Sequence, residues 1–203
     1  MLGANGAGKT TLLKILATLI RPTRGTAAVA GHDCVRDAEG ARPHLGLVAH
    51  GSYVYEDLTA VENLRFWTTL AGLSPAPAAL AGALARVELE RAADERVRTF
   101  SAGMKRRLSL ARFVLAQPSV LLLDEPFAGL DQRAKKWLEE HLGSFKASGG
   151  AILMATHSFG RELAVADRLA ILAGGAIALD TPRGALSADD VQRLYVVHTE
   201  DAP

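Results

Sequence analysis

Near its start the sequence reads Gly3-Ala4-Asn5-Gly6-Ala7-Gly8-Lys9-Thr10. This stretch fits the phosphate-loop pattern of glycine, four residues, glycine, lysine and serine or threonine. Its glycines allow the backbone to wrap around a phosphate, and the dipole of the following helix adds positive potential. We expect the whole stretch, with Thr11, to bind a nucleotide, Lys9 to neutralise the β- and γ-phosphates, and the Thr10 hydroxyl to bind Mg²⁺. The alternative interpretation is a chance glycine-rich turn.

The composition predicts a globular chain around this loop. Of 203 residues, 49% are hydrophobic and 22% charged, which excludes disorder as the dominant state. With 23 basic and 22 acidic residues the formal net charge is +1, so we expect no nucleic-acid partner. The one cysteine, Cys34, allows no intrachain disulfide and favours a reducing cytosol. Apolar runs such as residues 120–123 are too short to cross a membrane.

Short apolar runs alternate with helical spacing, a pattern typical of an α/β fold with a largely parallel sheet. Their continuous rather than alternating apolarity suits strands buried on both faces. Pro22 and Pro118 are expected to end the first two helices, because proline lacks a donor N–H. We predict strands at residues 45–49, 120–123 and 151–155, and helices at residues 10–19, 101–116 and 132–145.

The strand pattern disappears between residues 58 and 98, where helical spacing indicates an inserted lobe. A Gly-Gly pair within residues 169–179 predicts a hairpin, and a weaker helical region begins at residue 181. We therefore expect a single domain over residues 1–203. Its parts would be an α/β core at 1–57 and 117–180, a helical lobe at 58–116 and a C-terminal tail at 181–203.

An acidic pair, Asp124 and Glu125, follows the apolar run at residues 120–123. A buried strand would deliver Asp124 to the carboxyl edge of the sheet, where its carboxylate can hold Mg²⁺ through the water shell. Glu125 would then polarise an attacking water. Strands often end in acidic residues, so this interpretation depends on the phosphate loop upstream.

Two further motifs complete an ordered set. Ser101 is a natural N-cap for the helix that continues through Ala102 and Gly103, and it lies 23 residues before Asp124. His157 ends the apolar run at 151–155, 33 residues after Asp124, and we expect it to contact the γ-phosphate. The simpler interpretations are a capped helix start and a structural histidine.

This ordered set resembles the ATP-binding subunit of ABC transporters over nearly the whole chain. The resemblance implies a phosphate-loop NTPase (RecA-like) core with an inserted helical subdomain, ATP and Mg²⁺ as cofactors, and ATP hydrolysis coupled to transport. It also implies a homodimer or paired ATPase domains, in which Ser101, Ala102 and Gly103 of one copy complete the ATP site of the other. Asp131 matches the D-loop aspartate of the family, and His157 matches its switch histidine. Separate integral-membrane permease subunits would hold the protein at the cytoplasmic face of the inner membrane.

His50 occupies the position where the family usually has a glutamine that reaches Mg²⁺ and the attacking water. A neutral imidazole nitrogen can accept a hydrogen bond or bind the metal there. Together with residues 57–64 and 124–131, His50 makes the chain look most like the haem-exporter ATPase of cytochrome c maturation. We expect a permease to dock near residues 51–55, with Tyr53 and Tyr55; ordinary packing of those tyrosines is the alternative.

Family members usually carry some 25 to 30 residues before the phosphate loop, including the strand that enters it. Here Met1 and Leu2 precede the loop, which predicts an upstream start or a fragment. An inactive fragment lacking the first strands is therefore one alternative. A soluble non-transport ABC ATPase is another, and a phosphate-loop kinase, which would not need Ser101–Gly103 or His157, is a third.

Overall fold

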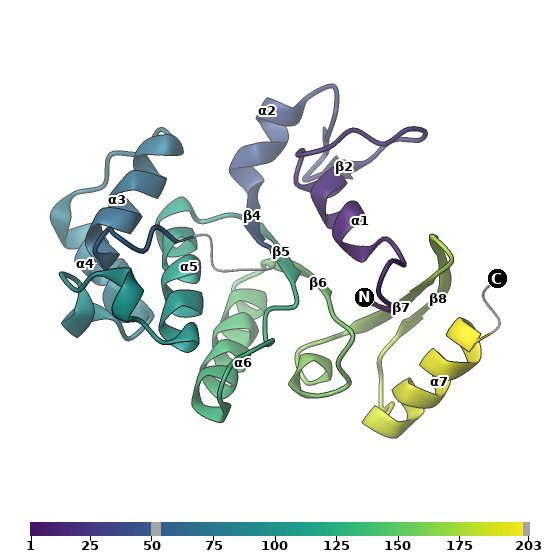
Figure 1. Ribbon diagram of the computed structural model, residues 1–203. Helices are drawn as coiled ribbons and strands as arrows, with labels where there is room; N and C mark the ends of the chain where they lie inside the picture. The colour runs from purple at the N-terminus through teal and green to yellow at the C-terminus, as the bar shows by residue number, and fades with distance from the viewer. Residues whose placement is uncertain (50–53, 201–203) are drawn as a thin grey trace.

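Figure 1 shows the computed structural model of the chain, in which residues 1–49 and 54–200 are described. Three parallel strands lie in the order β4-β5-β6, and a second group has the order β1-β7-β8, with β1 parallel to β7 and β8 antiparallel to it. The sheet thus has the predicted, largely parallel α/β arrangement. The strands are β1 (Leu2–Gly3), β4 (Leu45–Val48), β5 (Val120–Asp124), β6 (Ala151–Ala155), β7 (Arg168–Ala173) and β8 (Ala176–Pro182).

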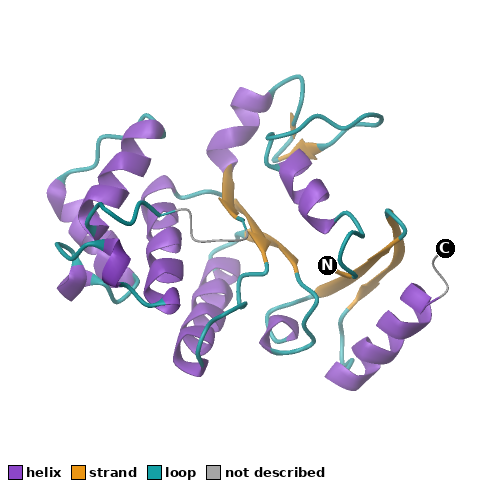
Figure 2. Ribbon diagram, viewed as in Figure 1, coloured by secondary structure: helices purple, strands orange, loops and turns teal. Residues whose placement is uncertain are grey.

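Strand β5 is apolar at every position before Asp124 because both of its faces are covered by helices (Figure 2). Leu122 packs in one cluster with Leu13 of α1 (Lys9–Leu16). Leu121 and Leu123 point to the other face, where they join Leu138 of α6 (Gln132–Ala147). Successive side chains of a strand alternate between faces, so a strand sandwiched in this way needs a continuous apolar run.

Strand β1, at Leu2–Gly3, is a short central strand that leads into the phosphate loop. Leu2 pairs with Ile171 of β7 on one side and forms a parallel bridge with Thr156, just after β6, on the other. The Met1 amino group donates to Met154 O at 2.7 Å, and Thr156 N donates to Met1 O at 3.0 Å. These contacts join the β4-β5-β6 group to the β1-β7-β8 group. Strands β6 and β7 also line a cavity of about 590 Å³ beside Met1.

Helix α1 is shorter than the sequence predicts. It ends at Leu16 rather than at residue 19, and Ala17 is its C-cap. Thr18 adopts a left-handed conformation with φ of 61°, and Leu19 N donates back to Lys14 O. The backbone thus closes the helix in the manner of a Schellman-type turn, well before Pro22 could interrupt it.

Three packed helices account for most of the region between β4 and β5: α3 (Ala60–Leu70), α4 (Pro77–Arg86) and α5 (Ala102–Ala116). A capping box of Thr59 and Glu62 begins α3, and Pro77 occupies the first position of α4. The buried leucines Leu64, Leu84 and Leu108, one from each helix, meet in one apolar cluster. The sequence boundaries given for the lobe remain a prediction.

The remaining elements lie at the margins of the sheet. Gly174 and Gly175, both with positive φ, form the turn between β7 and β8, which confirms the predicted hairpin. Helix α7 (Ala188–Glu200) packs on β7 and β1 through Val191. A small antiparallel pair and a short helix follow α1, namely β2 (Ala28–Val29), β3 (His32–Asp33) and α2 (Ala38–Ala41). Short 3₁₀ turns occupy Arg42–His44, Glu90–Ala92, Val97–Thr99 and Arg161–Leu163.

Across residues 1–49 and 54–200, no helix combines the length and the apolarity needed to traverse a lipid bilayer.

Candidate active site

The phosphate-loop stretch forms a tight turn between β1 and α1. Gly3 lies so close to β7 that a Cβ there would stand 2.7 Å from Leu172 O, which explains why only glycine fits the start of the loop. Gly6 and Gly8 have φ of 85° and 103°, a conformation that side chains disfavour. The loop thereby leads directly from the sheet into α1 and borders a cavity of about 440 Å³.

The N-terminus of α1 faces this cavity and has the chemistry of an anion site. Gly8 is the N-cap of α1, and no side chain caps the helix. The first N–H groups of a helix have no partner within the helix, and the helix dipole concentrates positive potential there. These residues therefore fit a phosphate group, as the sequence analysis expects of the loop.

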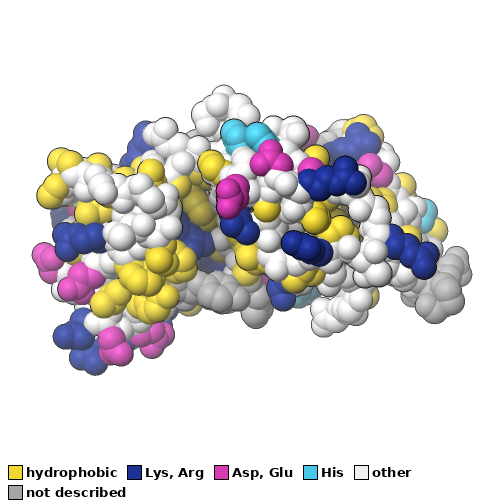
Figure 3. Space-filling view, turned by 90° about the horizontal axis from the view of Figure 1, so that it is seen from above, with side chains coloured by type: hydrophobic (Ala, Val, Ile, Leu, Met, Phe, Trp, Pro, Cys, Tyr) yellow, Lys and Arg dark blue, Asp and Glu magenta, His cyan; other side chains and the backbone are white. Residues whose placement is uncertain are grey.

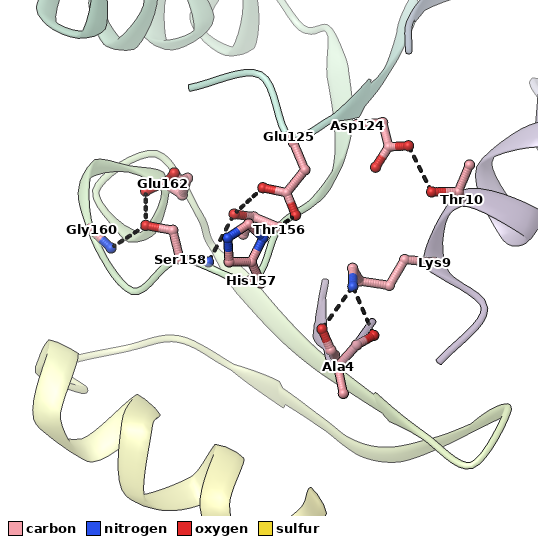
Figure 4. A network of polar contacts seen from close by, with 11 residues as sticks. Ala4, Lys9, Thr10, Asp124, Glu125, Thr156, His157, Ser158, Gly160 and Glu162 are labelled. Carbon is pink, nitrogen blue, oxygen red and sulfur yellow. Dashed lines mark hydrogen bonds and ion pairs between the residues drawn. The ribbon is translucent and has the colours of Figure 1, made fainter. Parts of the chain in front are cut away.

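Lys9 is buried and folds back over the loop. Its Nζ donates to Gly3 O at 2.7 Å and to Ala4 O at 3.1 Å (Figure 4). Because both acceptors are neutral loop carbonyls, phosphate oxygens can replace them with charged ones, which bind an ammonium more strongly.

Thr10 and Asp124 meet across the boundary between α1 and β5. The Thr10 hydroxyl donates to Asp124 Oδ2 at 2.7 Å, and the Asp124 side chain is buried at the carboxyl end of its strand. A hydroxyl and a carboxylate are oxygen donors of the kind that Mg²⁺ binds, usually together with waters and substrate phosphates. The donor set therefore fits the ion that the sequence predicts at these two residues.

Glu125 lies one residue further, in a left-handed conformation with φ of 48°. His157 Nδ1 donates to Glu125 Oε1 at 2.7 Å, and the Thr156 hydroxyl donates to Glu125 Oε2 at 3.2 Å (Figure 4). Both carboxylate oxygens are thus held by consecutive residues at the end of β6. Sequence reasoning assigned no role to Thr156. The signal for it was its position beside His157, directly after a buried strand.

The cavity gathers the phosphate loop and the two strand ends in one place. It is lined by Asn5, Gly6, Gly8, Lys9, Thr10, Thr11, Asp124, Glu125 and His157. A basic group, a metal-binding oxygen pair and a clamped carboxylate therefore surround one space, which is the arrangement needed to hold a phosphate chain and direct water at it.

The other predicted site residues lie elsewhere or outside the described part. Ser101 caps α5, accepting from Met104 N at 3.2 Å, and Asp131 caps α6, accepting from Ala134 N at 2.8 Å. A Cβ on Gly103 would meet Ala134 Cβ at 3.0 Å, so the two helix starts lie against each other. Ser101, Ala102 and Asp131 are exposed to solvent, and Gly103 is partly exposed. His50 and residues 51–53 lie outside the described residues.

A second cavity, of about 500 Å³, separates α1 and β4 from the helical region. Figure 3 shows hydrophobic and basic side chains inside a hollow between these parts. The Arg112 guanidinium lies 4.7 Å from the ring centres of both Trp67 and Phe113 and donates to Leu47 O. Burial lowers the pKa of Arg112 to about 10. Tyr55, of the predicted docking segment, is 47% exposed and packs edge-on against Phe66.

Comparison with curated proteins finds relatives named for drug resistance and for Nod factor export. The chain is 36% identical over 191 residues to the daunorubicin resistance ATP-binding protein DrrA3 of Streptomyces coeruleorubidus, covering 93% of this chain and 60% of that protein. It is 39% identical over 201 residues to the Nod factor export ATP-binding protein I of Burkholderia orbicola, covering 96% of this chain and 66% of that protein. The chain thus spans somewhat less than two thirds of the length of these relatives.

Solved structures share the fold. A structure described as the ATP-binding subunit of an ABC transporter superposes with a TM-score of 0.79 at 31% identity, covering 97% of this chain and 81% of that one. A dimeric ATP-binding cassette, in a post-hydrolysis state with ADP and Pi, gives the same TM-score at 22% identity, over 91% of this chain and 84% of that one. A family model described as ABC transporter matches residues 1–128. With its phosphate loop, its acidic strand end and these likenesses, the chain belongs to the ABC transporter family.

Proposed function

We propose that this chain is the ATP-binding and ATP-hydrolysing domain of an ABC exporter. The observation that carries the proposal is the single cavity shared by Lys9, Thr10, Asp124, Glu125 and His157. Family membership and relatives named for drug resistance and Nod factor export support the same function.

The phosphate loop binds the triphosphate of ATP. Backbone N–H groups at the start of α1 contact phosphate oxygens, and Lys9 exchanges its two carbonyl partners for the β- and γ-phosphates. Thr10 and Asp124 would hold Mg²⁺, with Asp124 acting through the water shell of the ion. The ion would supply positive charge that neutralises the phosphates.

Glu125 orients and activates the attacking water. Its carboxylate is mostly buried, at 14% side-chain exposure, and it lies at the cavity wall. A carboxylate in that position can accept a proton from water as the water attacks the γ-phosphate. His157, whose side chain is 64% exposed, is free to turn from Glu125 toward the γ-phosphate.

The functional unit we propose is a head-to-tail pair of ATPase domains. Ser101, Ala102 and Gly103 lie outside the phosphate cavity, at the solvent-facing start of α5. A second copy can present this helix N-terminus to the ATP of the first, and Asp131 belongs to the same surface. In the predicted division of the chain, the α/β core carries the phosphate loop and the helical lobe carries Ser101–Gly103. These are the two surfaces that such a pair would bring together.

Membrane permease subunits are the partners we propose, which would hold the chain at the cytoplasmic face of the membrane. The mainly apolar hollow beside β4, lined by Leu19, Leu47 and Leu73 among others, is the surface that we propose for a helix of the permease. Leu19 and Leu73 are exposed leucines in its lining, as suits a surface covered by a partner.

The substrate we favour is a drug or Nod-factor-like molecule, following the names of the relatives. Haem export stays as the narrower second hypothesis, and it rests on His50 together with residues 57–64 and 124–131. None of the relatives reported above carries a haem-export name, so the hypothesis has only the sequence pattern in its favour.

ATP hydrolysis by the purified chain tests the proposal. Wild type should release phosphate from ATP in the presence of Mg²⁺, and Lys9→Ala should lose ATP binding. Lys14→Ala is the matched control, because Lys14 lies on the same helix but is exposed and outside the phosphate cavity. Equal ATP affinity in wild type and Lys9→Ala would contradict the proposed site. Co-purification with a membrane permease separates the exporter from a soluble ABC ATPase or a kinase.

A further inference from the structure

Glu125 is held in a conformation that its own backbone disfavours. Its φ of 48° lies in the left-handed region, where residues other than glycine are strained. Its N–H donates to Ala155 O at 2.9 Å, which continues the β5–β6 ladder past the end of the strand. The surrounding contacts, rather than local preference, therefore determine where the carboxylate points.

The two residues that hold this carboxylate differ in freedom. The His157 side chain is 64% exposed, whereas Thr156 is only 4% exposed. His157 can leave Glu125 for the γ-phosphate in the proposed reaction. When it does, the Thr156 hydroxyl on Oε2 is the hydrogen bond that stays with Glu125 among the contacts described above.

The hydroxyl of Thr156 has one proton, and its surroundings direct that proton to Glu125. Ser158 N donates to Thr156 Oγ1 at 3.0 Å, which uses the hydroxyl as an acceptor on that side. The backbone of Thr156 is fixed as well, because its N–H donates to Met1 O and its Cα pairs with Leu2. A β-branched side chain on an anchored backbone has few rotamers, so the hydroxyl stays in place.

We propose that Thr156 is a positioning residue for hydrolysis, which holds Glu125 in its reactive orientation while His157 engages the γ-phosphate. The inference rests on the proposed ATPase function and extends it. Thr156 touches neither nucleotide nor water in this scheme and acts only through Glu125. Its anchor on Leu2 also ties the orientation of Glu125 to the strand that enters the phosphate loop.

The test compares Thr156→Val, which removes the hydroxyl but keeps the shape, with Thr156→Ser, which keeps the hydroxyl. Thr156→Val should lower kcat about tenfold to a hundredfold, as expected for losing a hydrogen bond to a charged group, and leave the Kd for ATP within about twofold of wild type. Thr156→Ser should recover most of kcat. Thr68→Val is the matched control, because Thr68 is equally buried but lies on α3. A kcat for Thr156→Val within twofold of wild type overturns the inference.

A double-mutant cycle distinguishes positioning from a general structural effect. In a Glu125→Gln background, Thr156→Val should cause little further loss of hydrolysis, since the group that it positions is already changed. An equal loss in both backgrounds, or an ATP affinity that falls together with kcat, contradicts the inference. Crystal structures test the geometry independently of hydrolysis. The Glu125 carboxylate should move in Thr156→Val and keep its place in Thr156→Ser; an unmoved carboxylate in Thr156→Val refutes the inference even if the ATPase assignment fails.

Discussion

Asn63 fastens the segment after β4 to the helical region, and its replacement by alanine tests that role. The Asn63 side chain is fully buried on α3. Its Oδ1 accepts from Tyr55 N at 2.8 Å, and its Nδ2 donates to the carbonyls of Tyr55, Leu58 and Thr59 at 2.9, 3.4 and 2.9 Å. One side chain therefore serves four backbone groups of a loop without regular structure.

The size of the effect follows from which of those groups keep another partner. The carbonyls of Tyr55, Leu58 and Thr59 still accept from Leu58 N, Val97 N and Asn63 N, respectively. Tyr55 N alone of the four loses its partner. An orphaned amide costs about 1–3 kcal/mol, and each of the two shorter bonds from Nδ2 contributes about 0.5–1.5 kcal/mol. Asn63→Ala should therefore lower the free energy of unfolding by about 2–6 kcal/mol.

Urea denaturation followed by tryptophan fluorescence measures this loss, with Thr68→Ala as the control. Thr68 is equally buried on the same helix, and its hydroxyl donates to Leu64 O and Arg65 O. Those carbonyls lie within the helix and keep their own backbone donors, so Thr68→Ala should cost only about 1 kcal/mol. If Asn63→Ala is no more destabilising than Thr68→Ala, the accounting of backbone partners is wrong.

Three further predictions concern chemistry, pH and packing. Glu125→Gln should slow hydrolysis about 10²–10⁴-fold and leave ATP binding intact, as measured by phosphate release and nucleotide titration; a near-normal rate would remove Glu125 from its assigned role. Burial, and then the charge of Arg86, lower the pKa of His141, so the unfolded chain takes up a proton that the folded chain resists. The free energy of unfolding should therefore fall as the pH drops below the ordinary histidine range of about 6.5, and His141→Gln should flatten that fall in urea titrations at several pH values. Gly3→Ala should destabilise the fold and weaken ATP binding, because the new Cβ overlaps a backbone oxygen of β7, whereas Gly143→Ala, in open space on α6, should stabilise the fold by about 0.5–1 kcal/mol; equal effects on the melting temperature would contradict the packing argument.

Features that depend on neighbouring residues were predictable from the sequence. The phosphate loop needs glycines at fixed positions, and β5 needs an unbroken apolar run before Asp124. Both patterns can therefore be recognised in the amino-acid sequence. The same holds for Ser101, which caps α5 as expected. These features follow from backbone sterics, strand periodicity and capping, which operate over a few residues.

Features that depend on distant residues were not predictable in the same way. Leu2–Gly3 forms a strand because Leu2 pairs with Thr156, just after β6, and with Ile171 of β7, both more than 150 residues away in sequence. The early end of α1 depends on the left-handed conformation of Thr18, which cannot be predicted from a threonine in the sequence. The hydrogen bond from Thr156 to Glu125 joins residues that are 31 apart in sequence. The assignment of His50 lies outside the described residues and stays a prediction, as do the roles given to the other site residues.

The two-residue strand β1 links the nucleotide site to the stability of the sheet. Met1 and Leu2 connect the β4-β5-β6 group to the β7-β8 hairpin through hydrogen bonds and strand pairing. The phosphate loop begins at the next residue. A phosphate bound by that loop would stabilise β1 and its pairing with β6 and β7. ATP binding would thus stabilise the pairing that holds the two groups of strands together. Backbone amides of β6 and β7 would then exchange with solvent more slowly when ATP is bound. Binding of ATP would then be detectable as a rise in the local stability of the sheet.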